Sequence, residues 1–486
     1  MLRDLLKDGG LYTLANMLTK GIGLLLIPFY SSYFTQAEYG ILAMLGIVGA
    51  MSAALFSFQI YQGVGRFIAE ADLTIKDKQK IGSTGFWFTF LSYTLFLVLG
   101  LYFQDSIIEL LSEDERIKNS TFILSLVAIF LYGLFYTLSV QLKFLRMTKA
   151  YTLTTFLQSI LNILLILCFA FVLDYRIDSI YMASLVITPI MIMMQIYFLK
   201  DYLILYLGKL ELKKLLKFSS PLIPAAISYL ILNFTDRIFI KEMTGALAEV
   251  GIYDMAFKFT SIVTIIIVSF QSALAPIIYE QHKNEGTKEN LGRIFRLFLA
   301  VGSFGGLLLA YFSYETLYIF TQPNYYSAST LMPVFYLSIL ISGMGLFSPG
   351  LHIKGKTYLI ALIVIASASV NIALNYYLIP IYGIFGAACA TLVSTLFNNS
   401  ILFIISQKLY TLVFPKSKTS LVLSVFIIVY VFGSYVDQFI SLNYISLLGI
   451  KTLLLILYIW FLIRLDFINY RVVTNWIKTT IYAKKN

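Results

Sequence analysis

Charged residues are scarce in this chain of 486 amino acids, where Asp, Glu, Lys and Arg together make up 13% of the sequence. A soluble domain usually carries about twice that share. Hydrophobic residues reach 59%, and the mean hydropathy is +0.83. Polar connections are also short, since the longest, near 200–217 and 280–296, run for under about 20 residues. No soluble domain is expected, and the composition indicates an integral membrane protein.

Cysteine and histidine are nearly absent, which excludes most chemistry built on them. Cys168 and Cys389 both lie in apolar runs and provide neither a disulfide framework nor a metal-ligand spacing. His282 and His352 are far apart in the sequence, and no Gly-x4-Gly-Lys-Ser/Thr phosphate loop is present for ATP hydrolysis. With no catalytic constellation, the chain is not expected to be an enzyme or to carry a cofactor.

Long apolar runs dominate what is present. A bilayer core of ~30 Å is crossed by a helix of ~20 apolar residues. The runs are continuous rather than alternating, which favours helices over the strands of a membrane barrel. The opening residues MLRDLLKDGG are too acidic and too short for a cleavable leader, so the first span is expected to be retained. About fourteen spans are expected, near 10–33, 41–65, 82–104, 119–141, 150–173, 177–199, 218–240, 250–279, 297–312, 329–351, 358–379, 384–406, 420–436 and 445–463.

The basic residues sort by the side of the membrane. With an even number of spans and the N-terminus inside, 28 of the 36 Lys and Arg residues fall in inside connections and 5 on the outside, where Arg237 at the outer end of its span is counted. Lys20, Lys258 and Lys451 fall within spans. This asymmetry is the positive-inside rule, so both termini are expected to be cytoplasmic. It also accounts for the net charge of +11 without a nucleic-acid partner, because anionic lipid attracts basic cytoplasmic loops.

The sequence repeats itself at an offset of 211 residues, since AEYGILAM at 37–44 returns as AEVGIYDM at 248–255. A second echo, at an offset of 209, pairs Asn162 with Asn371. Both pairs occupy matching positions in two sets of six spans, as in transporters whose parallel repeats are related by an axis along the membrane normal. We expect an N-terminal lobe at 1–210 (spans 1–6), a C-terminal lobe at 211–410 (spans 7–12), and spans 13–14 with a cytoplasmic tail at 411–486.

Four segments resemble a known family. They are Asn16-x3-Lys20 followed by IPFYSSYFTQAEYG, then NFTDRIFI at 233–240, AEVGIYDMAFKF at 248–259 and NIALNYYLIPIYGIFGAACATLVS at 371–394. They resemble the Wzx-like flippases of bacterial O-antigen and capsular polysaccharide repeat units, in the polysaccharide transporter branch of the MOP superfamily. The resemblance implies an all-α integral membrane protein with two six-helix lobes of the MATE/MOP type, which alternate access, plus two extra C-terminal helices.

The same resemblance implies a substrate and a setting. The substrate would be an undecaprenyl-pyrophosphate-linked oligosaccharide, carried from the inner to the outer leaflet of the bacterial inner membrane for O-antigen, capsule or exopolysaccharide assembly. The partners would be this lipid-linked oligosaccharide and membrane lipids, with a polysaccharide polymerase and a chain-length regulator as further candidates. A coupling ion, H+ or Na+, is left open.

Ionisable residues inside spans are candidates for function, because a charge that faces lipid costs several kcal/mol. Lys20 lies mid-span, one turn from Asn16, and could bind an anionic lipid head group or pair with a carboxylate between helices. A polar face of the second span descends to the inner surface through Gln59, Gln62, Arg66 and Glu70. Arg66 could therefore face a cytoplasmic vestibule or simply pair with Glu70.

A second set of charges lies in the outer halves of the seventh and eighth spans. Arg237 follows Asp236, and Asp254 and Lys258 stand one helical turn apart. The cations could line a cavity for pyrophosphate, or the four residues could form a salt-bridge network that locks an outer gate. A coupling role for Asp254 is a further alternative.

Polar residues elsewhere in the spans have a plainer interpretation. Ser367, Asn371 and Asn375 form one stripe, and Gln158 and Asn162 a shorter one. Interhelical hydrogen bonding is favoured over glycan binding for both stripes. Lys451, in the last span, is expected to snorkel or to pair with a carboxylate.

Three functions compete. The first is a lipid-linked oligosaccharide flippase, and the alternative with the same fold is a multidrug or small-molecule exporter. The third is a membrane glycosyltransferase or polymerase, which would usually show a long outward loop. The outward connections near 105–118 and 313–328 are short, and an exporter of cations should present unpaired carboxylates in its spans. The sequence therefore favours the flippase.

Overall fold

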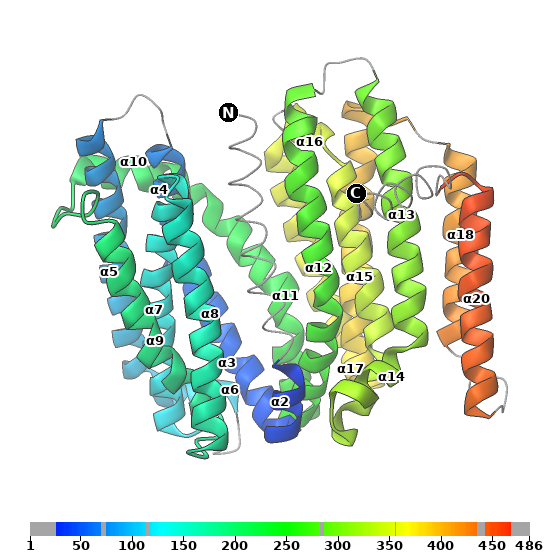
Figure 1. The fold of residues 1–486 in the computed structure, drawn as a ribbon, viewed down its shortest axis with the longest axis horizontal. Helices are drawn as coiled ribbons and strands as arrows, with labels where there is room; N and C mark the ends of the chain where they lie inside the picture. The colour runs from blue at the N-terminus through cyan, green and yellow to red at the C-terminus, as the bar shows by residue number, and fades with distance from the viewer. Residues whose placement is uncertain are drawn as a thin grey trace, which may run out of the picture.

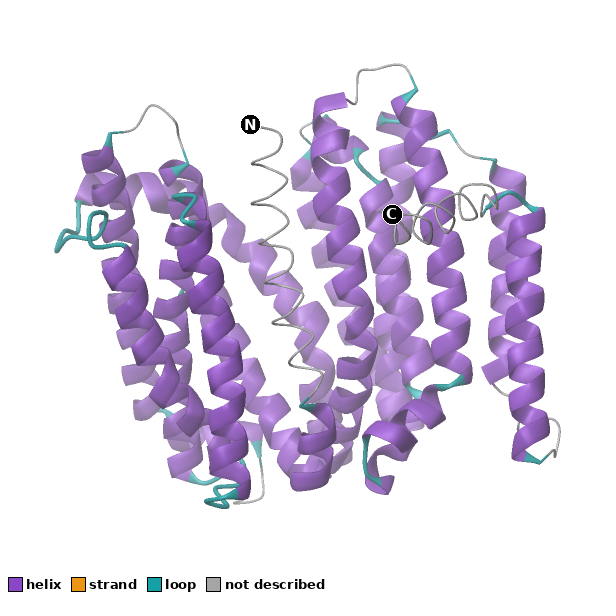
Figure 2. Ribbon diagram, in the orientation of Figure 1, coloured by secondary structure: helices purple, strands orange, loops and turns teal. Residues whose placement is uncertain are grey.

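The structure is a computed structural model that describes residues 26–69, 74–112, 117–281, 286–354, 356–413, 415–434 and 443–467. Within these ranges all regular secondary structure is helical, as Figure 2 shows. The all-α membrane fold expected from the sequence is therefore confirmed.

The first half of the chain supplies the helices that stand on one side of the molecule in Figure 1. They are α2 (Ile27–Tyr33), α3 (Gln36–Leu55), α4 (Ile60–Ile68), α5 (Ile75–Tyr102), α6 (Gln104–Leu111), α7 (Asn119–Phe144), α8 (Thr148–Phe171) and α9 (Asp178–Phe198). Capping boxes begin two of them, because the Thr35 and Thr74 side chains accept backbone hydrogen bonds while Glu38 and Asp77 return the contact. Helix α7 lies inside this group, between α5 and α9.

The second half begins with a surface helix and continues through the other group of spans. Its elements are α10 (Lys209–Ser219), η1 (Ser220–Leu222), α11 (Ile223–Thr244), α12 (Leu247–Gln281), α13 (Thr287–Tyr311), α14 (Ser313–Phe320), η2 (Pro323–Thr330), α15 (Met332–Met344), η3 (Gly345–Phe347), α16 (Gly350–Ile353), α17 (Thr357–Leu409), α18 (Lys416–Ser434) and α20 (Tyr444–Arg464). In Figure 1, α18 and α20 stand at the far edge of this group.

The described helices fit a polytopic membrane protein. Nine are long and apolar enough to cross a bilayer, or up to eleven if two bent pairs each count as one span. The pairs bend by 45° and 49°, near Pro221 and Pro333, because a proline removes a backbone N–H and disrupts the helix. Helix α17 is one long element with non-helical backbone at Gly383 (φ 56°, ψ −139°), so it holds the expected eleventh and twelfth spans. Most of the expected first span, 10–33, lies outside the described residues.

The last two helices pack against α13 and α14. A Cβ on Gly433 would overlap the ring of Tyr311, so α18 approaches α13 closely, and the Tyr311 hydroxyl donates to the Val429 carbonyl at 2.7 Å. Lys451 of α20 is buried, and its ammonium lies 3.6 Å from a Glu315 carboxylate oxygen. Of the two alternatives for Lys451, the structure shows the pair with a carboxylate.

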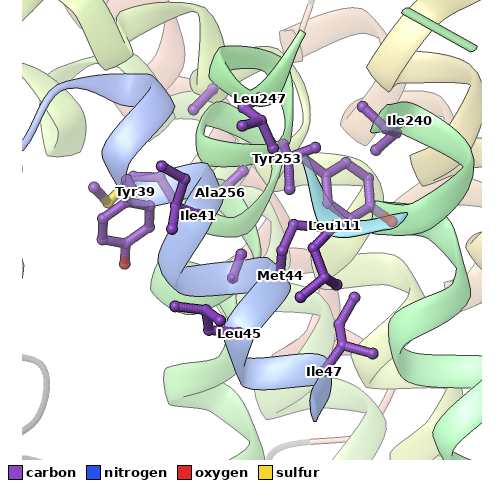
Figure 3. Packing of buried hydrophobic residues seen from close by; sticks show 14 of the residues in the cluster. Tyr39, Ile41, Met44, Leu45, Ile47, Leu111, Ile240, Leu247, Tyr253 and Ala256 are labelled. Carbon is purple, nitrogen blue, oxygen red and sulfur yellow. The ribbon is translucent and has the colours of Figure 1, made fainter. Parts of the chain in front are cut away.

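The two halves meet where α3 packs on α11 and α12. Figure 3 shows this junction, with Tyr39 and Met44 of α3 beside Leu247 and Ala256 of α12. The closest approach of α3 and α12 occurs twice, in matching form. A Cβ on Gly40 would overlap the Leu247 carbonyl oxygen, and a Cβ on Gly251 would overlap the Gln36 carbonyl oxygen.

These four positions obey the sequence repeat, because Gly40 and Gly251, and Gln36 and Leu247, are each 211 residues apart. Such reciprocity is what a two-fold relation between the repeated segments requires. The lobe boundaries near 210 and 410 themselves stay a prediction.

Candidate functional site: buried charges beside the helix junction

Arg237 and Asp254 form a buried ion pair between α11 and α12. The Arg237 Nε and Nη2 donate to Asp254 Oδ1 at 3.0 and 2.7 Å, and Nη1 donates to the Asn233 carbonyl at 2.6 Å. The guanidinium carbon also lies 5.3 Å and 5.1 Å from the ring centroids of Phe234 and Phe257. Both charged residues are buried, at 3% and 6% exposure. Arg237 is therefore neutralised in this conformation, which favours the gate interpretation over a free cation for pyrophosphate.

Lys258 extends this pair toward the first half of the chain. Its Nζ lies 3.6 Å from Asp254 Oδ2, and it stands 4.5 Å from the centre of the Tyr39 ring in α3. Tyr30 of α2 lies 5.9 Å away on the same side. The Lys258 side chain is 42% exposed, so its ammonium bridges the two repeats while part of it stays accessible.

Asp236 accepts hydrogen bonds from a different set of residues. Its Oδ1 accepts from Asn375 Nδ2 at 2.6 Å, and its Oδ2 accepts from the Tyr253 hydroxyl at 2.6 Å and from the Thr391 hydroxyl. The carboxylate is only 2% exposed. The expected four-residue network of Asp236, Arg237, Asp254 and Lys258 therefore divides, because neighbouring residues on a helix face different directions.

A chain of neutral polar side chains extends from Asp236 along α17. Asn375 also donates to Asn371 Oδ1 at 3.2 Å, and Asn371 Nδ2 lies 3.4 Å from the Ser394 hydroxyl. Ser367, Asn371 and Asn375 are fully buried, so interhelical hydrogen bonding, the favoured interpretation of this stripe, is confirmed. Sequence reasoning missed Thr391 and Tyr253 as partners of Asp236, although hydroxyl-bearing residues in an apolar helix are a usable signal.

Arg66 lies apart from these charges, on the exposed face of α4. Its guanidinium carbon is 4.7 Å from the ring centre of Phe218 in α10, where Lys214 stands 4.1 Å from the ring centre of Phe67. Among the described residues no carboxylate lies within ion-pair distance of Arg66. Its expected alternative partner, Glu70, lies outside the described residues, as do Asn16 and Lys20.

Several hydrogen bonds tie the halves together at the end that the charge rule assigns to the outside. The Tyr325 hydroxyl donates to the Phe34 carbonyl at 3.3 Å, and the Gln36 amide donates to the Asn324 carbonyl. Beside them Arg176 Nε donates to Glu38 at 3.0 Å, which fixes the α8–α9 turn on the start of α3. This end of the junction is therefore closed in the structure.

The described residues contain no cluster of His, Cys, Asp or Glu that could hold a metal ion as three or more such ligands. The site contains a buried ion pair, a half-exposed lysine and a buried carboxylate whose hydrogen-bond partners among the described residues are all neutral. Such an arrangement can hold charge or exchange a small cation, and it sits where two halves meet.

Fold and site together define a polytopic helical membrane protein with buried charges where its two repeated segments meet. The chain belongs to the family described as polysaccharide biosynthesis protein, which it matches over residues 5–282. This membership confirms the polysaccharide branch of the expected resemblance.

Solved structures share the fold at low sequence identity. A structure of the lipid II flippase MurJ in an inward closed conformation is 17% identical with a TM-score of 0.67, over 93% of this chain and 99% of that one. An inward-facing multidrug resistance MATE family transporter of the MOP superfamily is 13% identical with a TM-score of 0.63, over 80% and 94%. A MATE transporter of Vibrio cholerae, VcmN, is 15% identical with a TM-score of 0.53, over 82% and 93%. No curated protein matches the chain.

Proposed function

We propose that this protein carries undecaprenyl-pyrophosphate-linked oligosaccharides from the inner to the outer leaflet of the bacterial inner membrane, with both termini in the cytoplasm. The observation that carries the proposal is that a chain with a transporter fold belongs to a polysaccharide biosynthesis family. The fold alone would equally suit a multidrug exporter. The family membership favours a glycan-bearing substrate, which a polymerase and a chain-length regulator would then use.

Cations near the path would lower the cost of moving a pyrophosphate through the membrane. Coulomb attraction at ~4 Å is worth about 4 kcal/mol at an effective dielectric near 20. Arg66, which has no carboxylate partner among the described residues, and the half-exposed Lys258 are the accessible candidates. Lys20 and Asn16 stay candidates from the sequence alone, and Arg237 joins them only if the gate opens its ion pair.

Alternating access supplies the transport step. In this conformation the predicted outer end is held by the Gly40–Gly251 junction and by the hydrogen bonds of Phe34 and Gln36. Release to the outer leaflet requires this junction to open, and Lys258 would then leave the ring of Tyr39. The Arg237–Asp254 pair stands next to that movement.

Asp236 is the candidate for coupling transport to a cation, either H+ or Na+. Its carboxylate is buried among an amide and two hydroxyls, so a proton or a small cation could neutralise it without breaking an ion pair. Asp254 is less suited, because Arg237 and Lys258 already neutralise it. The chain would need no other cofactor.

We expect Asp236→Asn to remove the response of transport to imposed H+ and Na+ gradients, because the neutral amide no longer requires a cation. Uptake into proteoliposomes with and without each gradient measures this response. Glu242→Gln, on the same helix but with 44% exposure, is the matched control and should keep it. An unchanged gradient response in Asp236→Asn would remove Asp236 from the coupling role.

A deletion strain tests the function itself. Cells that lack this gene should accumulate lipid-linked repeat units and lose surface polysaccharide, and the wild-type gene should restore both. Lys20→Ala should fail to restore them at normal protein level, while Lys20→Arg restores part, since the charge survives but its geometry changes. Normal surface glycan in the deletion strain, together with altered drug sensitivity, would instead support the exporter.

A further inference from the structure

Helix α7 lies inside the first group of helices, yet two of its tyrosines are exposed. Between Ser125 and Leu142, Tyr132 and Tyr136 are the only exposed residues of this helix, at 56% and 42%. They stand one turn apart and therefore on one face. Their rings are stacked, with centroids 6.4 Å apart and planes 27° from parallel.

Helix α4 adds two side chains to the same face. The Tyr61 ring meets the Tyr136 ring edge-on, with centroids 5.0 Å apart. The Tyr61 hydroxyl donates to Gln59 Oε1 at 2.7 Å, and Gln62 Nε2 donates to the same oxygen at 2.8 Å. Gln62 is exposed, so its amide is presented beside the aromatic rings.

The backbone that carries this group is unusual. Phe58 and Gln59 both have left-handed φ values, of 46° and 50°, in the turn that separates α3 from α4. Non-glycine residues adopt that conformation only where their surroundings stabilise it. Here Gln59 Nε2 donates to the Ala53 carbonyl at 3.1 Å. The side-chain oxygen of Gln59, Oε1, accepts from Tyr61 and Gln62.

This face does not suit contact with lipid. An exposed amide in a membrane span normally faces a water-filled path or protein, because lipid cannot satisfy it. Arg66 follows Gln62 by one turn on α4, also exposed, toward the predicted cytoplasmic end. The face therefore runs from a cation near the inner surface to an amide and three tyrosine rings deeper in the span.

We propose that Tyr61, Gln62, Tyr132 and Tyr136 form a platform that binds pyranose rings of the oligosaccharide. The C–H faces of a pyranose pack on aromatic rings, and its hydroxyls hydrogen-bond to amides and phenols. Neither the Tyr132 nor the Tyr136 hydroxyl has a hydrogen-bond partner among the described residues, so both can serve a ligand. Arg66 would hold the pyrophosphate while the sugars lie on the platform. The proposal rests on the proposed function.

Binding to the purified full chain in lipid nanodiscs tests it with two probes. One is undecaprenyl pyrophosphate, and the other is the polyprenyl-pyrophosphate oligosaccharide extracted from cells that lack this gene. The wild type should bind the sugar-bearing lipid more tightly. Tyr132→Ala and Tyr136→Ala should each lower the affinity for the sugar-bearing lipid roughly three- to tenfold. The affinity for undecaprenyl pyrophosphate should stay unchanged. Tyr136→Phe keeps the ring face and should keep most of the affinity.

Ile123→Ala, an exposed apolar position on the same helix, is the matched control and should bind both probes as the wild type does. Thermal unfolding without ligand shows whether each variant is folded. Equal loss of both lipids in folded Tyr132→Ala, or no loss of either, would overturn the platform and leave the flippase intact. A wild type that binds neither lipid would instead contradict the proposed function, and the platform with it.

Discussion

The buried Arg237–Asp254 ion pair is the single contact whose loss should destabilise the protein most clearly. Asp254→Ala leaves a buried guanidinium without its carboxylate, and breaking a buried pair in this way costs about 3–5 kcal/mol. We therefore expect Asp254→Ala to lower the unfolding temperature in detergent markedly. Removing both charges together, as Arg237→Met with Asp254→Leu, should recover much of the loss because no buried charge remains unpaired.

Arg176→Ala is the control for this prediction. Its pair with Glu38 is hydrogen-bonded but the Arg176 side chain is 45% exposed, so its removal should cost no more than about 1 kcal/mol. An Asp254→Ala protein as stable as Arg176→Ala would show that the buried pair does not hold α11 against α12.

At the residue scale, the sequence could indicate which charges matter but not which ones meet. Charges in apolar spans identified Arg237, Asp254 and Lys258 as candidates, and helical spacing placed Lys258 one turn from Asp254. Helical spacing alone could not bring Asp236 to Asn375, since 139 residues separate them. Whether Arg237 is free or neutralised depends on such distant contacts.

At the scale of elements, the α3–α12 junction depends on two glycines. A Cβ at Gly40 would overlap the Leu247 carbonyl, whereas a Cβ at Gly46 of the same helix would meet open space. Gly40→Ala should therefore separate α3 from α12 near the predicted outer end, at a cost of about 1–3 kcal/mol for overpacking. We expect this variant to favour conformations in which the outer junction is open.

A cross-link measures that opening. Cysteines at Gln36 and Asn324, whose side chain and carbonyl are hydrogen-bonded here, should cross-link readily in a background without Cys168 and Cys389. Adding Gly40→Ala should reduce the yield, and adding Gly46→Ala should not. Equal yields in the two would mean that the glycine contact does not close this end.

Most elements could be predicted from the sequence, and one break could not. Apolar runs predicted the spans, because the thickness of a bilayer sets the length of an apolar helix. The bends lie near Pro221 and Pro333, where the missing N–H acts locally. The turn at Phe58–Gln59 divides the second span although it contains neither glycine nor proline. Its stability comes from side-chain hydrogen bonds of Ser57 and Gln59, which no periodic pattern reveals.

At the scale of the whole molecule, orientation is the first property to test. The excess of Lys and Arg in alternate connections predicts that Gln322 and Tyr382 face the outside and that Lys213 and Lys416 face the cytoplasm. A membrane-impermeant thiol reagent added to intact cells should label cysteines introduced at the first two positions and spare the other two. The opposite labelling pattern would mean that the protein has the reverse orientation in the membrane, with the closed end of the junction on the cytoplasmic side.

Transport in a purified system tests the central claim most directly. Proteoliposomes would carry the extracted polyprenyl-pyrophosphate oligosaccharide, labelled on its glycan with a fluorophore that an impermeant reductant destroys from outside. We predict that the protein makes the protected inner-leaflet fraction accessible, and that Tyr132→Ala slows this exchange. A protected fraction that stays as large as in protein-free vesicles, while the same vesicles transport a cationic drug, would contradict the account and identify an exporter.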